Sequence, residues 1–155
     1  MRKPLRVLIL EDSEDDSLLL LRELKRSGYE VEFERVDTAS AMRSALTRKT
    51  WDLILSDYSM PDFNAPKALE LLKTSELDLP FIIVSGTIGE ETAVAALKAG
   101  ANDFLVKGKF SRLGPAIERE LREAESRNDR RRAEEQLRYQ ANLLANVTDA
   151  IIAAD

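Results

Sequence analysis

The chain has 155 residues, of which 44% are hydrophobic and 33% are charged, and its formal net charge is −5. This composition is typical of a globular protein and excludes collagen-like and disordered chains. The sequence contains no cysteine and no histidine, which excludes disulfides, thiolate catalysis, Ser-His-Asp triads and histidine metal ligands.

No apolar run approaches the roughly 20 residues that a membrane-spanning helix needs, so we expect a soluble, cytoplasmic protein without a membrane partner. Residues 1–108 carry 14 basic and 19 acidic side chains, whereas residues 109–140 carry 9 basic and 7 acidic ones. The acidic first part argues against a nucleic-acid partner, and the basic excess of the second part is interleaved with glutamates, as in a solvated helix.

Five apolar runs alternate with amphipathic patterns, which predicts an α/β fold with a doubly wound parallel sheet covered on both faces. The predicted strands are residues 5–10, 31–36, 53–56, 81–85 and 103–106. Apolar residues spaced by three and four predict four intervening helices. Their markers are Leu18, Leu21 and Leu24, then Met42, Ala45 and Leu46, then Leu69 and Leu72, then Ala93, Val94 and Leu97.

A fifth helix is predicted from Ser111 onward, and its pattern shows no convincing end. Residues 125–132 contain no apolar side chain, after which Ala133, Leu137, Gln140 and Leu144 recur at the spacing of a coiled coil. Residues 150–154 read as a short strand with no partner in the sequence. We therefore divide the chain into a globular domain of residues 1–125 and a helical linker of residues 126–155, which suggests a piece of a longer protein.

Polar side chains end or directly follow four of the five predicted strands. Glu11 and Asp12 follow the first strand, Asp57 the third, Ser85 ends the fourth, and Lys107 follows the fifth. Because ligands of open parallel sheets bind beyond the carboxyl ends of the strands, we expect these groups to converge. Each residue alone could serve as a helix cap or a turn residue, but three clustered carboxylates repel unless a divalent cation and a lysine neutralise them.

Magnesium suits such a pocket, because it takes one or two carboxylates and keeps several waters, and manganese could replace it. Phosphoryl transfer requires an ionised carboxylate nucleophile, a cation and hydrogen-bond donors directed at the phosphoryl oxygens. Asp57, the cation, Lys107 and Ser85 supply these components. The pocket therefore predicts a site that accepts a phosphoryl group.

The sequence resembles the receiver domains of bacterial response regulators over residues 4–125. The motifs are LILED at 8–12, DLILSDYSMPD at 52–62, FIIVSGT at 81–87 and ALKAGANDFLVK at 96–107. The resemblance implies a flavodoxin-like sheet in the strand order 2-1-3-4-5 with an extended C-terminal helix. It also implies a two-component phosphorelay in which a histidine kinase or phosphotransfer protein donates the phosphoryl group and a receiver that is not itself an enzyme accepts it.

The resemblance assigns roles to individual residues. Asp57 is the phosphoacceptor, Asp12 and Asp57 bind the metal directly, Glu11 binds it through water, and the backbone carbonyl of Ser59 is a further ligand. Ser85 and Lys107 would hold the phosphoryl group.

Further residues fall at the family's regulatory positions. Ser85 and Phe104 stand at the switch positions, although Phe104 is equally well explained as core packing, and Ser59 and Thr87 stand where the family tunes phosphoryl lifetime. The chain departs from the family pattern at Gly108, where a proline is usual, and at residues 62–65, which lack the usual glycines.

The segment LRYQANLLANVTDAIIAAD at 137–155 resembles the entry helix and first strand of a PAS sensor domain. A solvated helix is the alternative interpretation of this segment. If the continuous helix transmits a signal, a homodimer formed through it is expected.

Two other functions compete with a phosphorylated receiver. A small phosphatase with an aspartyl nucleophile would want a second aspartate two residues after Asp57, where this chain has Ser59. A degenerate receiver would use the same fold as an interaction module without ever being phosphorylated. The complete set of pocket residues favours the phosphoacceptor.

Overall fold

The computed structural model describes residues 2–86 and 89–153, with side chains described as far as residue 147. The chain divides into two compact units, Met1–Leu121 and Arg122–Asp155. No helix among the described residues combines the length and apolar character needed to cross a membrane.

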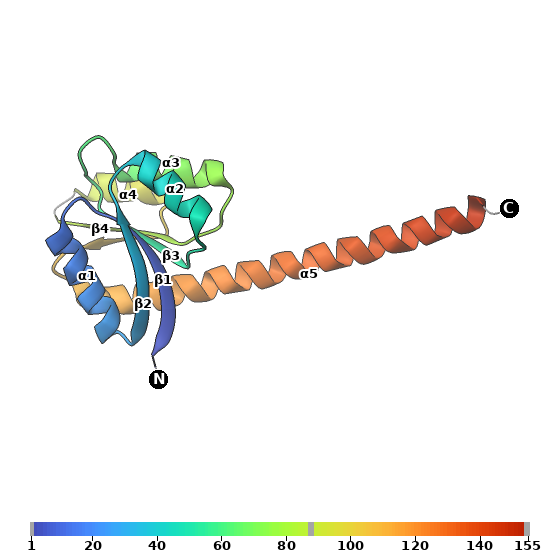
Figure 1. Ribbon diagram of the computed structural model, residues 1–155, viewed down its shortest axis with the longest axis horizontal. Helices are drawn as coiled ribbons and strands as arrows, with labels where there is room; N and C mark the ends of the chain where they lie inside the picture. The colour runs from blue at the N-terminus through green and yellow to red at the C-terminus, as the bar shows by residue number, and fades with distance from the viewer. Residues whose placement is uncertain (1, 87–88, 154–155) are drawn as a thin grey trace. The chain divides into compact units, whose positions relative to one another are not determined.

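The first unit is built on a five-stranded parallel sheet with the order β2-β1-β3-β4-β5, as predicted (Figure 1). The strands are β1 Lys3–Leu10, β2 Tyr29–Val36, β3 Leu53–Ser56, β4 Phe81–Ser85 and β5 Asp103–Val106. The last three have the predicted bounds, and the first two begin two residues earlier than predicted. Because all the strands run in the same direction, their carboxyl ends meet at one edge of the sheet.

Helices cover both faces of the sheet, as the alternating pattern predicted. They are α1 Glu14–Arg26, α2 Ala39–Arg48, α3 Ala65–Ser75, α4 Glu90–Lys98 and α5 Leu113–Ala153. On one face, side chains of α2, α3 and α4 pack in a single buried cluster that includes Met42, Leu69 and Ala96. On the other face, α1 and the first turns of α5 form a second cluster that includes Leu24 and Ile117. The central strands β1, β3 and β4 are therefore enclosed on both sides.

Local sequence signals fix several helix ends. The side chain of Thr38 caps α2 by accepting a hydrogen bond from the backbone N–H of Ala41 at 3.1 Å. Gly28 and Gly100, after α1 and α4, have φ values of 98° and 121°, a region that glycine adopts without strain. Gly108, the residue after Lys107, also lies in this region, with φ 98°.

The helices predicted from Leu18, Leu21 and Leu24 and from Ala93, Val94 and Leu97 are confirmed, but these markers are not all buried. In α1 the buried residues are Ser17, Leu20 and Leu24, whereas Leu18 is 54% exposed. In α4 only Ala96 is buried, and the predicted markers Val94 and Leu97 are 43% and 44% exposed.

The exposure of markers in both helices has the same physical cause. Apolar residues surround much of each helix, so spacing alone does not select the inward face, and a close approach to the sheet favours a small side chain such as alanine.

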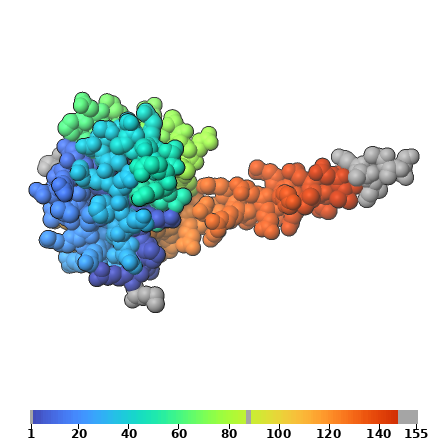
Figure 2. Space-filling model, in the orientation of Figure 1, coloured from blue at the N-terminus to red at the C-terminus, as the bar shows by residue number. Residues whose placement is uncertain are grey.

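In the view of Figure 2, the surface of unit 1 turned to the viewer is formed largely by the blue and cyan first part of the chain, which includes α1 and β2.

The fifth helix begins later than predicted. A short 3-10 helix, Phe110–Arg112, precedes α5, which starts at Leu113. Leu113 and Ile117, in the first turns of α5, are fully buried. Beyond the first unit, Leu137 and Leu144 are 66% and 69% exposed.

The strand predicted at residues 150–154 is wrong, because residues 150–153 are helical. A helix satisfies its backbone hydrogen bonds within the segment, whereas a single strand needs a neighbour.

A carboxylate connects the start of β5 with α5. Asp103 accepts the backbone N–H of Phe104 at 2.8 Å through Oδ1, and the Arg119 guanidinium at 2.6 Å through Oδ2. The hydrogen bond and charge of Asp103 raise the pKa of Arg119. The carboxylate thus joins a strand residue to a helix residue sixteen positions along the chain.

Candidate functional site

The sheet hydrogen bonds continue just past the strands and position the predicted site residues. The backbone N–H of Glu11 donates to the carbonyl of Val36 at 3.0 Å, and that of Asp57 donates to the carbonyl of Leu10 at 2.8 Å. The backbone N–H of Lys107 donates to the Ser85 carbonyl at 2.6 Å. The chain is therefore held extended at the points where the polar residues begin, and their side chains meet at the carboxyl edge of the sheet.

Three of the predicted carboxylates lie together. One oxygen from each of Glu11, Asp12 and Asp57 lies within 4.8 Å of the others. Glu11 is 1% exposed, Asp57 is half-buried and Asp12 is exposed, so the group opens to solvent on one side. Three carboxylate oxygens with an open side fit a hard divalent cation such as Mg²⁺, which binds oxygen and retains waters.

Burial, with a smaller contribution from repulsion, perturbs the carboxyl groups of Glu11 and Asp57. Burial raises the pKa of Glu11, and the nearby Asp12 and Asp57 add to that effect, while hydrogen bonds from Lys107 and from the Ser13 backbone oppose it. Burial also raises the pKa of Asp57, against the opposing charge of Lys107 and the backbone N–H of Tyr58. For both groups, burial disfavours the ionised carboxylate more than Lys107 and the backbone N–H groups favour it.

Lys107 contributes the positive charge of the pocket. Its Nζ lies 2.9 Å from Glu11 Oε2, 2.7 Å from Asp16 Oδ2 and 3.6 Å from Asp57 Oδ2. Burial acts to lower the pKa of Lys107, but the hydrogen bonds to Asp16 and Glu11 and the charge of Asp57 outweigh it and raise the pKa. The ammonium therefore stays charged among three carboxylates.

Asp16 was missed by the sequence reasoning, which considered only residues that directly follow strands. It lies in the first turn of α1, four residues after Asp12. Asp12 precedes the helix, so the sequence signal for Asp16 is only its place among the three acids of the first turn of α1.

The two oxygens of the Asp57 carboxylate have different environments. Oδ1 accepts the backbone N–H of Tyr58 at 2.8 Å, while Oδ2 is the atom near Lys107. The ring of Tyr58 lies 6.3 Å from that of Phe104, centroid to centroid, at an interplanar angle of 48°. Phe104 is partly buried against the core on the α2, α3 and α4 face.

The other residues predicted for the site are Ser85, Ser59 and Thr87. Ser85 is buried and pairs in register with Val106, the residue before Lys107. Ser59 lies two residues after Asp57 and is exposed. Thr87 lies outside the described residues.

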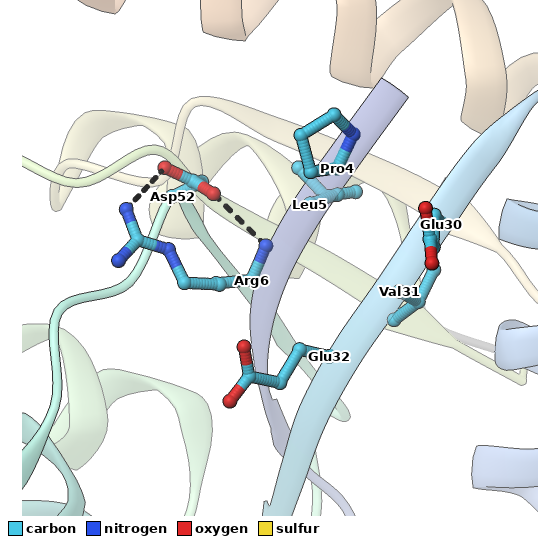
Figure 3. Close-up of a pocket in the computed structure, with 7 residues that line it drawn as sticks. All are labelled: Pro4, Leu5, Arg6, Glu30, Val31, Glu32 and Asp52. Atoms are coloured by element: carbon cyan, nitrogen blue, oxygen red, sulfur yellow. Dashed lines mark hydrogen bonds and ion pairs between the residues drawn. The ribbon is translucent and has the colours of Figure 1, made fainter. Parts of the chain in front are cut away.

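A separate cavity of about 610 Å³ lies where β1 and β2 begin, at the edge opposite the carboxylates (Figure 3). It is lined by Pro4, Leu5, Arg6, Glu30, Val31, Glu32 and Asp52. Asp52 accepts the backbone N–H of Arg6 at 2.9 Å and pairs with its guanidinium at 3.5 Å (Figure 3). Arg6 and Asp52 thus pair with each other and connect β1 to the start of β3, which is a structural role for the polar groups of this cavity.

Comparison with known proteins identifies the class to which this sheet and pocket belong. The family model of the response regulator receiver domain matches residues 7–118, and the chain belongs to this family. The transcriptional regulatory protein PrrA of Mycobacterium tuberculosis is 38% identical over 102 residues, which are 66% of this chain and 43% of PrrA. The response regulator protein FleR of Pseudomonas aeruginosa is 33% identical over 102 residues, which are 66% of this chain and 21% of FleR. The chain therefore spans less than half the length of these relatives.

Solved structures agree with this assignment. The signal receiver domain of a putative LuxO repressor protein from Vibrio parahaemolyticus has a TM-score of 0.71 and 26% identity, and the match covers 83% of this chain and 96% of that one. Full-length FixJ from B. japonicum has a TM-score of 0.71 and 28% identity, with coverage of 83% and 63%. The expected receiver fold and its two-component class are thus confirmed.

Proposed function

We propose that this receiver accepts a phosphoryl group on Asp57 from a phosphohistidine of a partner kinase or phosphotransfer protein, with Mg²⁺ bound at Glu11, Asp12 and Asp57. The observation that carries this proposal is the convergence of three carboxylates and one ammonium at the end of the sheet. Mg²⁺, or Mn²⁺ in its place, would supply charge neutralisation for the transferred group.

The two oxygens of Asp57 suggest how the transfer proceeds. Oδ1 is held by the Tyr58 N–H, which leaves Oδ2 as the atom that attacks phosphorus. A P–O bond to Oδ2 forms as the P–N bond to the partner imidazole breaks, and the bonding electron pair stays on the imidazole nitrogen. Lys107, 3.6 Å from Oδ2, is placed to contact a phosphoryl oxygen, and Ser85 is proposed as the second group that holds it.

The other residue roles follow the same proposal. Asp12 would bind the cation directly, Glu11 through water, and the Ser59 carbonyl would complete the protein ligands. Ser59 and Thr87 would set the lifetime of the acyl phosphate, and Ser85 with Phe104 would form the switch. The contact between the Tyr58 and Phe104 rings supports this switch, because it links the residue after Asp57 to β5.

Intact mass after incubation with acetyl phosphate and Mg²⁺ tests the proposal. We expect the gain of one phosphate in the wild-type chain and none in Asp57→Asn. Asp37→Asn is the matched control, because Asp37 also follows a strand directly but is exposed and lies outside the carboxylate group. A wild-type chain that gains no phosphate would favour the alternative, a receiver that acts as an interaction module without phosphorylation.

The C-terminal segment is proposed to carry the signal onward. Residues 1–125 would form the receiver and residues 126–155 a linker helix that pairs with a second copy and leads into a PAS domain. The exposed Leu137 and Leu144, in register with Ala133 and Gln140, support pairing at coiled-coil spacing.

The mass in solution tests the pairing. We expect a dimer that Leu137→Glu with Leu144→Glu disrupts and that Asn142→Glu, on the opposite side of the helix, leaves intact. A monomer for the unsubstituted chain, with and without beryllofluoride, contradicts transmission through a dimer.

A further inference from the structure

Asp16 is a pocket carboxylate that is not part of the group able to hold a metal ion. Its backbone is fixed in the first turn of α1, where its N–H donates to the Ser13 hydroxyl oxygen at 3.2 Å. Its Oδ2 lies 2.7 Å from Lys107 Nζ, the shortest of the three contacts that this ammonium makes with carboxylates. The carboxylates that could share a metal ion are those of Glu11, Asp12 and Asp57.

The ammonium and a divalent cation need some of the same oxygens. Lys107 contacts Glu11 at 2.9 Å and Asp57 at 3.6 Å, and both belong to the candidate metal group. A cation that binds there competes with the ammonium for these two carboxylates and repels it. Asp16 is the partner of Lys107 that this competition leaves untouched.

We propose that Asp16 is a positioning residue that retains the Lys107 ammonium beside the pocket when a divalent cation occupies Glu11, Asp12 and Asp57. The inference rests on the cation site of the proposed function and is independent of phosphoryl transfer. With Asp16 present, the cation can bind Glu11, Asp12 and Asp57 while the ammonium keeps Asp16 as its own partner. Without it, the ammonium has only oxygens that the cation also needs, so the cation binds more weakly.

Mg²⁺ affinity measured by titration calorimetry tests this role. We expect Asp16→Asn to weaken Mg²⁺ binding roughly five- to tenfold, the lower end of a typical coupling between two sites. Asp15→Asn is the matched control, because Asp15 lies in the same helical turn, carries the same charge and is exposed. We expect it to weaken binding by less than about twofold, as distant surface charges do. Asp16→Glu, which keeps the charge, should recover much of the affinity.

A double-substitution cycle separates positioning from simple charge. In a Lys107→Met chain no ammonium competes with the cation, so adding Asp16→Asn should lower Mg²⁺ affinity no more than Asp15→Asn does. In the unsubstituted protein, the Lys107 ammonium signal in nitrogen-15 NMR should stay protected from exchange at saturating Mg²⁺. This second measurement does not depend on the folding of any variant.

The outcomes distinguish this inference from the proposed function. A wild-type chain that binds no Mg²⁺ overturns both. A wild-type chain that binds Mg²⁺, with equal affinities for Asp16→Asn and Asp15→Asn, overturns the role of Asp16 alone. Loss of the protected Lys107 signal on adding Mg²⁺ also overturns it.

Discussion

Replacing Lys107 by methionine would remove the positive charge from the pocket while keeping most of the side-chain volume. At an effective dielectric constant of about 20, unit charges 2.9 Å and 2.7 Å apart attract by about 6 kcal/mol each. These gross energies are largely offset by desolvation of the ions and by the ordering of a long side chain.

The net effect of the substitution can be bounded from the exposure of the partners. Removing one partner of a fully buried pair costs about 3–5 kcal/mol. The Lys107 side chain is 20% exposed and that of Asp16 is 38% exposed, so water screens part of the interaction. We expect Lys107→Met to lower the free energy of unfolding of the metal-free chain by about 2 kcal/mol near neutral pH.

Urea unfolding in the presence of a chelator measures this loss. Trp51 is the single tryptophan and is 6% exposed, so its fluorescence reports unfolding. Lys67→Met, at an exposed lysine of α3, is the control and should change stability by less than about 0.5 kcal/mol.

Mg²⁺ should reverse the effect, because a divalent cation neutralises the same carboxylates. With its competitor removed, Lys107→Met should bind Mg²⁺ roughly tenfold more tightly than the wild-type chain. Unchanged stability without metal, or weaker Mg²⁺ binding, would refute the electrostatic account of the pocket.

Three further predictions follow from the structure. The raised pKa values of Glu11 and Asp57 mean that the folded state binds protons more tightly than the unfolded one, so the metal-free chain gains stability as the pH falls through these values. Melting temperatures in chelator should show this gain, and an undiminished gain in Glu11→Gln contradicts it. Gly108→Ala should lower the free energy of unfolding, measured with urea, by about 1 kcal/mol or more, because alanine is strained at φ 98°. An unchanged urea midpoint argues against that backbone conformation. Leu24→Ala should cost about 2–5 kcal/mol and Leu18→Ala much less, because Leu24 is fully buried and Leu18 is 54% exposed; equal losses would contradict the buried face of α1.

The sheet and most of the pocket could be predicted because their signals are local in sequence. Each strand is a short apolar run, and parallel strands bring the residues that follow them to one edge. Glu11, Asp12 and Asp57 therefore meet as the order of elements predicts. Lys107 reaches the same carboxylates from the end of β5, as expected.

The errors arose where three-dimensional packing decides between equivalent local patterns. The leucine-rich α1 offers several apolar faces, and only contact with the sheet selects Leu20 and Leu24 over Leu18. Asp16 looked like one of three acids at a helix start, and its pairing depends on a lysine 91 residues away. The strand predicted near the C-terminus is helical because no neighbouring strand is available to it among the described residues.

The carboxylate of Asp103 links two elements of unit 1, β5 and α5, through its two oxygens. One oxygen accepts the N–H of Phe104 and the other accepts the Arg119 guanidinium, so a single carboxylate bridges β5 and α5 outside the apolar core. A displacement of the Phe104 backbone would reach Arg119 through this carboxylate, in addition to any repacking of Leu105 in the buried cluster that contains Leu113. Asparagine at position 103 would keep the hydrogen bond to Phe104 and remove the ion pair with Arg119. The link between β5 and α5 could therefore be broken without changing the apolar core.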